Sequence, residues 1–365
     1  MKNYNVIIIG GGAAGLTAAA SLNDEIKTCI LEKNSIPGRK IMATGGGRCN
    51  ITNAACDDKD IALDFFKSLG LETHCDDEGR YYPYSNRAED VVKVLTNKIA
   101  GKNTDVVTDF EVASVKETKD GFIVADAKGR SVSSEVLIIA CGGKAAPQLG
   151  TTGDGYALAR ALGHNVNKVY PILTGIKCGD LKSIKGVRAK GTVSLYKDGI
   201  MLASETGEIQ FNEDGISGIC VMNMTMHIVS EKGESLDDAL ARYYISLDMA
   251  PDFSSEELSF RESSFGLLTG KLSELISIDE IKAFKLPVLG VKGWKDAQCT
   301  AGGIDTSEIN MTTMESFKKE NLYFAGEILD IQGPCGGYNL QNAWETGIKA
   351  ARAINEKKCD TESIR

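Results

Sequence analysis

The chain lacks the residue patterns that metal and disulfide chemistry need. It has only three histidines, at positions 74, 164 and 227, and its ten cysteines include no pair with C-x-x-C spacing. The sequence therefore predicts no metal site, no zinc ribbon and no redox dithiol. We expect the cysteines to be reduced thiols that pack as small hydrophobic side chains.

Long apolar segments and an excess of positive charge are also missing. The longest apolar runs are Val6–Ile9 and Val136–Cys141, far below the roughly 18 to 20 residues that span a bilayer, and the start of the chain lacks a signal-peptide layout. The formal net charge is −9, which argues against nucleic acid or an anionic membrane as a partner. We expect a cytoplasmic protein with a small-molecule substrate; the composition leaves its oligomeric state open.

The start of the sequence has the order strand, glycine turn, helix, strand. Tyr4–Ile9 is a short β-branched run, Gly10–Gly12 interrupts it, and Ala13–Leu22 is rich in helix formers. Thr28–Leu31 is a second short apolar strand. This order is typical of a dinucleotide-binding fold.

The glycine turn has the spacing Gly10-x-Gly12-x-x-Gly15. The first glycine makes the tight turn, the second lets the backbone approach a pyrophosphate, and the third lets the helix pack close to its strand. Free N–H groups of the helix start, at Ala13 and Ala14, would hold the phosphates. We predict cofactor binding at these five residues.

An acidic residue follows at the distance that a ribose needs. Glu32 ends the second strand, and we expect both Glu32 and the adjacent Lys33 to contact the cofactor. A carboxylate there accepts hydrogen bonds from ribose hydroxyls and repels a 2′-phosphate. The bound adenosine should thus belong to FAD or NAD and not to NADP.

Two further strands end in glycines and favour FAD. Val136–Ala140 is followed by Gly142 and Gly143, and Leu322–Ala325 by Gly326 and Glu327. After Asp330 comes a glycine-rich loop with Gly336 and Gly337, and a helix predicted over Tyr338–Asn355 that includes Asn339. Because FAD is extended, its far end needs a cradle of its own, which this returning tail supplies. Anion binding at the helix start would stabilise reduced flavin.

The middle of the chain changes character. Strand-like segments, including one at Ile219–Met226, alternate with turns and are followed by a polar helical stretch. We therefore predict a discontinuous FAD-binding domain of residues 1–165 and 298–365, an inserted β domain of residues 166–232 and an inserted helical domain of residues 233–297.

Several motifs resemble one known family, the BaiN-like NAD(P)/FAD-dependent oxidoreductases. They are Ile36–Lys40, Thr44–Asn53, Gly150–Tyr156, Gly207–Ile209, Gly215–Gly218, Thr300–Ile304 and the tail from Ala325 to Gln341. The resemblance implies an α/β fold, a Rossmann-like FAD domain of the two-dinucleotide-binding type, interrupted by a β-barrel or sandwich domain and a small helical domain. It also implies electron transfer from a nicotinamide to an activated double bond, with 3-oxo bile acid intermediates as a candidate substrate.

The segment after the ribose strand should run toward the flavin ring. Arg39 or Lys40 could counter phosphate or flavin charge, and Gly46, Gly47 and Cys49 would line the cofactor. We expect Arg48 and Asn50 to fix the isoalloxazine or a substrate oxygen, and Tyr338 is a candidate proton donor.

The resemblance implies an FAD-dependent ene-reductase acting on a small apolar substrate such as a steroid. No second Gly-x-Gly-x-x-Gly opens another nucleotide fold, so we expect that NAD(P)H visits transiently as electron donor or that another reductant reduces the flavin. A flavin oxidase or dehydrogenase, and a redox-responsive binding module, are the alternatives.

Overall fold

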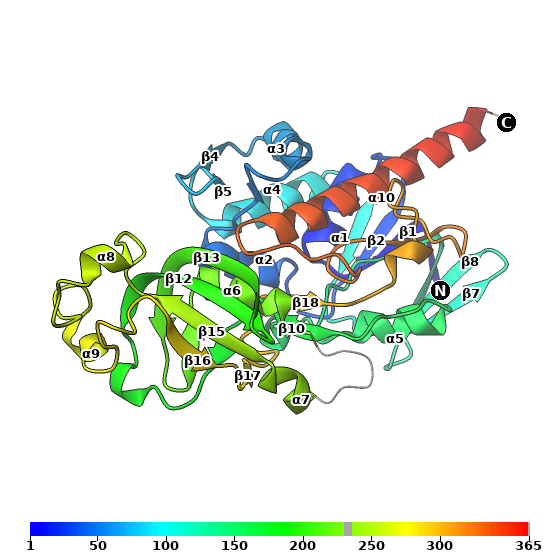
Figure 1. Ribbon diagram of the computed structural model, residues 1–365. Helices are drawn as coiled ribbons and strands as arrows, with labels where there is room; N and C mark the ends of the chain where they lie inside the picture. Colours follow the sequence, from blue (N-terminus) through cyan, green and yellow to red (C-terminus); the bar gives the residue numbers. More distant parts are fainter. Residues whose placement is uncertain (230–235, 364–365) are drawn as a thin grey trace. The chain divides into compact units, whose positions relative to one another are not determined.

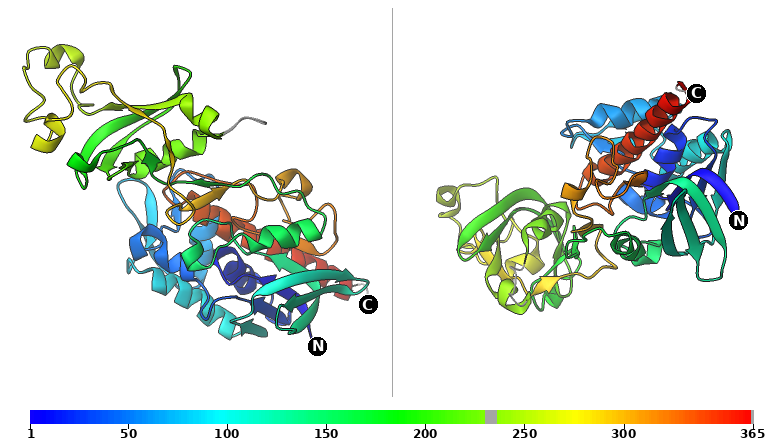
Figure 2. Two further views of the ribbon diagram at one scale, coloured as in Figure 1. Left: turned by 90° about the horizontal axis from the view of Figure 1, so that it is seen from below. Right: turned by 90° about the vertical axis from the view of Figure 1, so that its right-hand side faces the viewer.

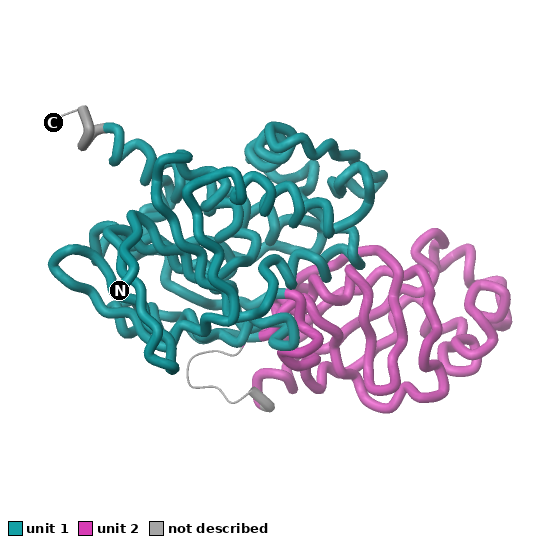
Figure 3. The backbone as a smooth tube through the Cα atoms, turned by 180° about the vertical axis from the view of Figure 1, so that it is seen from behind, with its two compact units in different colours: residues 1–170, 299–365 teal, residues 171–298 magenta. Residues whose placement is uncertain are grey.

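The computed structural model describes residues 1–229 and 236–363, and the chain divides into two compact units. Unit 1 combines residues 1–170 and 299–365, and unit 2 comprises residues 171–298 (Figure 3). The chain leaves unit 1 along β10 (Tyr170–Ile172) and returns along β18 (Cys299–Ala301). Within the described residues, no helix is both long and apolar enough to cross a bilayer.

Unit 1 is built on a seven-stranded sheet in the order β6-β2-β1-β9-β8-β7, with β19 also paired to β9 (Figure 1). Strand β1 lies between β2 and β9 and is parallel to both. This central place puts the carboxyl end of β1 in the middle of one sheet edge, where ligands bind in open α/β sheets. The strands are β1 (Lys2–Ile9), β2 (Thr28–Leu31), β6 (Thr104–Val107), β7 (Val112–Thr118), β8 (Gly121–Asp126), β9 (Ser131–Ile139) and β19 (Leu322–Phe324).

Strand β9 joins two parts of the sheet because its two halves have different neighbours. Ser131–Ser134 pairs antiparallel with β8, and Leu137–Ile139 pairs parallel with β19. The returning C-terminal strand therefore completes the N-terminal sheet, as the glycine-ended strands predicted. The Rossmann-like α/β fold is confirmed.

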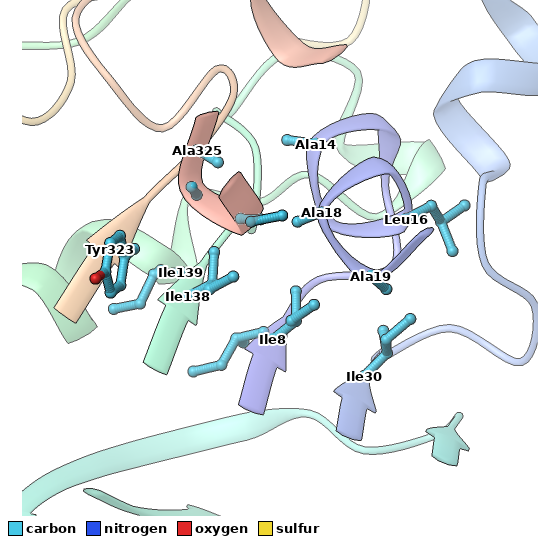
Figure 4. Packing of buried hydrophobic residues seen from close by; sticks show 14 of the residues in the cluster. Ile8, Ala14, Leu16, Ala18, Ala19, Ile30, Ile138, Ile139, Tyr323 and Ala325 are labelled. Atoms are coloured by element: carbon cyan, nitrogen blue, oxygen red, sulfur yellow. The ribbon is translucent and has the colours of Figure 1, made fainter. Parts of the chain in front are cut away.

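Three helices carry most of the packing around this sheet: α1 (Ala13–Ser21), α4 (Ala88–Ala100) and α10 (Tyr338–Ser363). Ile8, Ile30 and Ile138 point from their strands toward α1 (Figure 4). Helix α10 contacts α1, and a Cβ at Gly347 would lie only 2.5 Å from the carbonyl oxygen of Ala14. Two views show α10 running beside the sheet (Figures 1 and 2).

Shorter elements surround this core. The helices are α2 (Arg39–Ala43), α3 (Lys59–Ser68) and α5 (Asp154–Ala161), and the strands β3 (Thr52–Asn53), β4 (Thr73–Cys75) and β5 (Arg80–Pro83) form a small antiparallel sheet. Trp344 on α10 packs edge-on against Phe66 of α3, with ring centroids 5.1 Å apart. Its indole N–H donates to the carbonyl oxygen of Ile51 at 3.0 Å, so α10 fixes the chain just before β3.

Unit 2 is an antiparallel sheet in the order β16-β15-β12-β13-β14-β11-β17. Strands β12 and β13 form its long central hairpin, and alternate residues such as Val193 and Leu195 are buried. The strands are β11 (Ile176–Lys177), β12 (Arg188–Lys197), β13 (Ile200–Phe211), β14 (Gly215–Ser217), β15 (Tyr243–Asp248), β16 (Phe284–Pro287) and β17 (Gly290–Val291); the helices are α6 (Ile219–Met224), α7 (Leu236–Ala241), α8 (Ser255–Leu258) and α9 (Gly270–Ser273).

The prediction of a strand at Ile219–Met226 is wrong, because most of this segment is helix α6. Cys220, Val221 and Met224 are its buried residues, and their i, i+1, i+4 spacing is helical. The segment 233–297, expected to be helical, also supplies three strands, β15 to β17, to the unit 2 sheet. The division of the insert into a β domain and a helical domain stays a prediction.

Candidate functional site

The glycine turn between β1 and α1 has the geometry that a dinucleotide requires. Gly10 has a φ of 107°, and a Cβ there would lie 2.4 Å from the carbonyl oxygen of Ala140. A Cβ at Gly15 would lie 1.9 Å from the carbonyl oxygen of Gly10, so no larger residue fits either position. A Cβ at Gly12 would meet nothing within 4 Å. The backbone is therefore closely packed at the first and third glycines and open at the second.

Glu32 is buried at the end of β2 and holds the glycine turn. Its Oε2 accepts from the N–H of Gly11 at 2.8 Å, and its Oε1 accepts from the backbone and side-chain nitrogens of Asn34 at 2.8 and 2.6 Å. A carboxylate has about four acceptor positions, so one is left for a ribose hydroxyl. Glu32 can thus shape the turn and bind a ligand at once.

Lys33 and Arg39 both attach the loop before α5 to this edge of the sheet. Lys33 Nζ donates to Thr152 Oγ1 and Asp154 Oδ2, each at 2.7 Å. Arg39 donates to Asn34 Oδ1 at 2.9 Å and to the carbonyl oxygen of residue 148 at 3.3 Å. Lys33, expected to face the cofactor, is therefore neutralised by Asp154, whereas Arg39 keeps further N–H donors for a phosphate.

Lys40 and Glu327 form an ion pair that links α2 to the end of β19. Lys40 Nζ lies 2.6 Å from Glu327 Oε2, and the side chains are 24% and 17% exposed. Burial alone would lower the pKa of Lys40, but the charge of Glu327, the Cys299 thiol and the hydrogen bond to Glu327 together outweigh it and the pKa is raised. Glu327 Oε1 also accepts from the N–H of Thr300 at 2.9 Å. A Cβ at Gly143 would lie within 3 Å of both Thr300 and Glu327, so residue 143 packs directly against this ion pair and has no room for a side chain.

Four residues of the loop from Thr44 to Asn50 have a positive φ. Gly45, Gly46 and Gly47 have φ values of 57°, 65° and 87°, and a Cβ at Gly46 or Gly47 would meet nothing within 4 Å. Cys49 follows with a φ of 61° and is fully buried, and burial raises the pKa of its thiol to about 12. Cys49 is thus a packed thiol and not a nucleophile, as the sequence indicated.

Arg48 extends outward from this loop. Its side chain is exposed, and its guanidinium carbon lies 4.3 Å from the ring centroid of Tyr82. It donates to the carbonyl oxygen of Gly45 at 3.3 Å and to the Tyr82 hydroxyl at 3.4 Å. These two weak contacts leave most of the five guanidinium N–H groups for a ligand oxygen.

The start of α10 packs onto residues 50 to 53. Asn53 Nδ2 donates to the carbonyl oxygen of Gly336 at 2.9 Å. A Cβ at Gly337, whose φ is 108°, would lie 2.6 Å from the Thr52 carbonyl and 2.9 Å from Asn50 Oδ1. Asn50 is 8% exposed, and its Oδ1 finds no hydrogen-bond partner within the described chain. A buried acceptor of this kind suits an N–H or O–H donor of a ligand.

The other predicted tail residues have roles that the structure makes specific. Asn339 exchanges hydrogen bonds with the backbone of Gly333 at 2.9 and 2.7 Å, so it shapes the loop. Tyr338 is half-buried, and burial, with Cys56 nearby, raises the pKa of its hydroxyl. Asp330 accepts from Asn167 Nδ2 at 2.8 Å near the surface.

The structure brings the first and last parts of the chain together at this edge. A Cβ at Gly326 would lie 2.9 Å from Cβ of Ala14, and the N–H of Gly326 donates to Thr346 on α10 at 2.9 Å. Gly142 has a φ of 72° at the end of β9. The open backbone at Gly12 and Gly46, the spare acceptor of Glu32 and the unpaired Asn50 fit an extended dinucleotide such as FAD. That these residues bind the cofactor stays a prediction.

A buried Ser–His–Glu arrangement was not foreseen. His164 Nδ1 lies 2.9 Å from Glu308 Oε2, and His164 Nε2 lies 2.9 Å from Ser316 Oγ. The Ser316 oxygen accepts from the N–H groups of Lys318 and Lys319, so its own O–H must donate to His164. The imidazole is therefore neutral and donates to Glu308, and burial lowers its pKa. With both lone pairs used and only 7% exposure, Ser316 cannot serve as a nucleophile.

Metal ligands and reactive thiols do not form a second site in the described residues. No group of three or more His, Cys, Asp or Glu side chains there could hold a metal ion. Burial raises the pKa of Cys141 and Cys178 to about 12 and that of Cys220 to about 11. These thiols stay protonated at neutral pH.

The sequence matches a family and several characterised proteins along most of its length. The profile of the HI0933-like protein Rossmann domain matches residues 4–62 and 57–353. A 3-dehydro-bile acid delta(4,6)-reductase of Clostridium scindens is 34% identical, over 96% of this chain and 98% of the relative. A ribosomal RNA dihydrouridine synthase of Escherichia coli is 26% identical, over 97% of this chain and 98% of the relative.

A solved structure has the same fold. It is the 3-ketosteroid-delta4-(5alpha)-dehydrogenase from Rhodococcus jostii RHA1, in complex with 4-androstene-3,17-dione. Its TM-score is 0.51 at 13% sequence identity, and the match covers 97% of each chain. At this identity the likeness concerns the fold alone.

Proposed function

The chain belongs to the HI0933-like family, and on this premise we propose that it is an FAD-dependent oxidoreductase that reduces a carbon–carbon double bond conjugated to a carbonyl group. The observation that carries the proposal is the sheet edge where the glycine turn meets Glu32 and the returning segment at Gly326. The reductase from Clostridium scindens, whose name specifies double-bond reduction, supports this chemistry.

The chain's own residues divide the work of holding the cofactor. The open backbone at Gly12 and the N–H groups of the first turn of α1 bind the pyrophosphate. Glu32 accepts from a ribose hydroxyl with the position that Gly11 and Asn34 leave free. The loop at Gly46 and Gly47 and the α10 start receive the flavin end, with Asn50 Oδ1 accepting from a flavin N–H.

Once reduced by the electron donor, the bound flavin would supply a hydride to the β-carbon of the substrate. Arg48 donates hydrogen bonds to the substrate carbonyl oxygen and stabilises the negative charge that develops there. Tyr338, whose raised pKa keeps it protonated at neutral pH, delivers the proton to the α-carbon. Cys49 takes no part, because its buried thiol stays protonated.

The preferred substrate is a small, uncharged, largely apolar enone, such as a 3-oxo-Δ4 steroid or bile acid intermediate. The identity to the bile acid reductase supports it, as does the net charge of −9, which repels polyanions. The second candidate is a uridine in ribosomal RNA, whose ring also has a double bond conjugated to a carbonyl. Two ribosomal RNA dihydrouridine synthases, 26% and 28% identical over 97% and 98% of this chain, favour it.

The test begins with anaerobic titration of the purified protein with NADH and NADPH, followed through the flavin absorbance. The reduced protein is then mixed with 4-androstene-3,17-dione, or with a ribosomal RNA transcript, and the products are analysed for the reduced ring or for dihydrouridine. Reoxidation of the flavin by the steroid, with a reduced product, supports the proposal. Rapid reoxidation by oxygen without enone turnover would instead favour an oxidase.

A redox-responsive binding module is distinguished in the same experiment. The protein would then turn over neither acceptor, and a partner would bind only one redox state of the flavin. A colourless protein that gains no flavin absorbance when supplied with FAD would contradict the whole proposal.

A further inference from the structure

Four side chains, Arg48 on the glycine loop and Tyr82, His74 and Tyr84 at the three-stranded sheet β3-β5-β4, form a row of neighbouring contacts; we call them the aromatic row. The row begins at Arg48, whose guanidinium lies 4.3 Å from the Tyr82 ring centroid. The His74 ring follows, 6.0 Å from Tyr82, and Tyr84 lies 6.3 Å beyond His74 with its ring perpendicular. The row therefore starts at the proposed substrate oxygen and leads away from it.

The strand register explains why these residues share a face. His74 on β4 pairs directly with Tyr82 on β5, and cross-strand partners point to the same side of a sheet. Tyr84 lies in the turn that follows β5, and its ring is next to that of His74. The Tyr82 ring also supports the glycine loop, because a Cβ at Gly45 would lie 3.3 Å from its Cε1.

Arg48 is exposed, and from Tyr82 through His74 to Tyr84 the exposure rises in a way that core packing does not explain. Tyr82 is 2% exposed and belongs to the interior, but Tyr84 is 74% exposed. Its backbone N–H is satisfied by the carbonyl oxygen of Glu72 at 2.8 Å, so the backbone is fixed while the ring faces solvent. His74 is held by Asn86 at 3.1 Å. A fixed, exposed aromatic ring beside an ordered imidazole is suited to contact a flat ligand.

The charge around the row selects the kind of ligand. Residues 72–89 contain five acidic side chains and only two arginines. Arg80 is engaged by Asp76 and Glu78, and Arg87 by Glu89. A phosphate backbone would be repelled here, because nucleic-acid binding needs unpaired cations along its path. An uncharged ring system meets no such cost.

We propose that the aromatic row is the substrate-positioning surface, on which the fused rings of an uncharged enone lie with the carbonyl oxygen at Arg48. This inference rests on the proposed function and specifies its substrate class. Tyr84 and His74 are positioning residues that contact the rings away from the reacting bond. They should therefore affect substrate affinity and leave the chemical step unchanged.

The test compares Tyr84→Ser with Tyr84→Phe, and His74→Ala with the wild-type protein. The probe is 4-androstene-3,17-dione, with binding measured by equilibrium dialysis and turnover by steady-state kinetics. A lost aromatic contact of typical strength weakens binding by roughly three- to tenfold. We expect Tyr84→Ser to raise Kd and KM by that factor while kcat and flavin reduction by the nicotinamide stay unchanged. Tyr84→Phe should match the wild-type protein, because the ring and not the hydroxyl makes the contact.

The matched control is Phe317→Ser, which removes another exposed aromatic side chain of unit 1. Two results would contradict the proposal. One is that Tyr84→Ser binds the steroid with the same Kd as the wild-type protein, and the other is that Phe317→Ser loses as much affinity as Tyr84→Ser. If the wild-type protein binds the steroid without reducing it and Tyr84→Ser weakens that binding, the row stands and the proposed function fails. Loss of ribosomal RNA affinity in Tyr84→Ser would overturn the choice of an uncharged occupant.

Discussion

Replacing Lys40 by Met should destabilise unit 1 more than the loss of an ordinary surface charge would. The Lys40–Glu327 pair joins α2 to the end of β19 at 2.6 Å, and both side chains are less than one quarter exposed. Removing the ammonium leaves the Glu327 carboxylate with the Thr300 N–H as its remaining partner in this contact. A charged hydrogen bond contributes about 1.5–3 kcal/mol, and leaving one member of a buried pair costs up to about 5 kcal/mol. Because neither side chain is fully buried, we expect about 2–3 kcal/mol.

The double-mutant cycle isolates the pair. Glu327→Gln keeps an acceptor for Thr300 and leaves Lys40 able to reach water, so we expect a loss of about 1–2 kcal/mol. The double variant should lose less than the sum of the two single changes, by at least about 1 kcal/mol. The assay is urea unfolding followed by Trp344 fluorescence in a Trp294→Phe background, because Trp344 lies in unit 1 and Trp294 in unit 2. Losses that add to within about 0.5 kcal/mol would refute a direct coupling.

Three further predictions concern single residues. Glu32→Gln should lower the FAD content of the purified protein, because an amide cannot accept all the hydrogen bonds that the carboxylate receives; an unchanged ratio of flavin to protein would contradict that role. Arg48→Ala should keep FAD and slow enone turnover by about 10²-fold, the effect of losing one oxyanion donor, whereas purification as apoprotein would make Arg48 a cofactor ligand. The pKa of His164 is lower in the folded protein than in the unfolded chain. Its contribution to the free energy of unfolding is therefore present above about pH 6.5 and is lost as the pH falls. Urea unfolding should show this loss between pH 6.5 and 5 in the wild-type protein and not in His164→Asn; identical pH slopes would contradict it.

The parts of unit 1 that the sequence predicted have strong local signals. Glycines mark the ends of β1 and β19, and apolar, mostly β-branched residues fill Val6–Ile9 and Leu137–Ile139. The observed β2 (Thr28–Leu31) agrees residue for residue with its prediction, and α10 covers the helix predicted over Tyr338–Asn355. These elements could be predicted because steric limits at glycine and apolar periodicity act over a few residues.

What could not be predicted depends on contacts between distant residues. In the sequence, His164 is more than 140 residues away from each of its two hydrogen-bond partners, Glu308 and Ser316. No local sequence pattern marks these residues. The two-residue spacing of Tyr82 and Tyr84 is visible in the sequence. The position of His74 beside Tyr82 depends on the register between β4 and β5, which the sequence does not show. Helix α6 was predicted as a strand because a short apolar run gives no length signal to separate the two.

The contact between α1 and α10 has a consequence for how the protein is made. On the ribosome, β1 and α1 emerge before β19 and α10, which follow some 300 residues later. At about 5–20 residues per second, the apolar face of α1 that receives Gly347 waits tens of seconds for its partner. Such non-local pairing slows folding and leaves early hydrophobic surface open to aggregation. The insertion of unit 2 thus delays the packing of α10 against α1 until synthesis has passed residue 347.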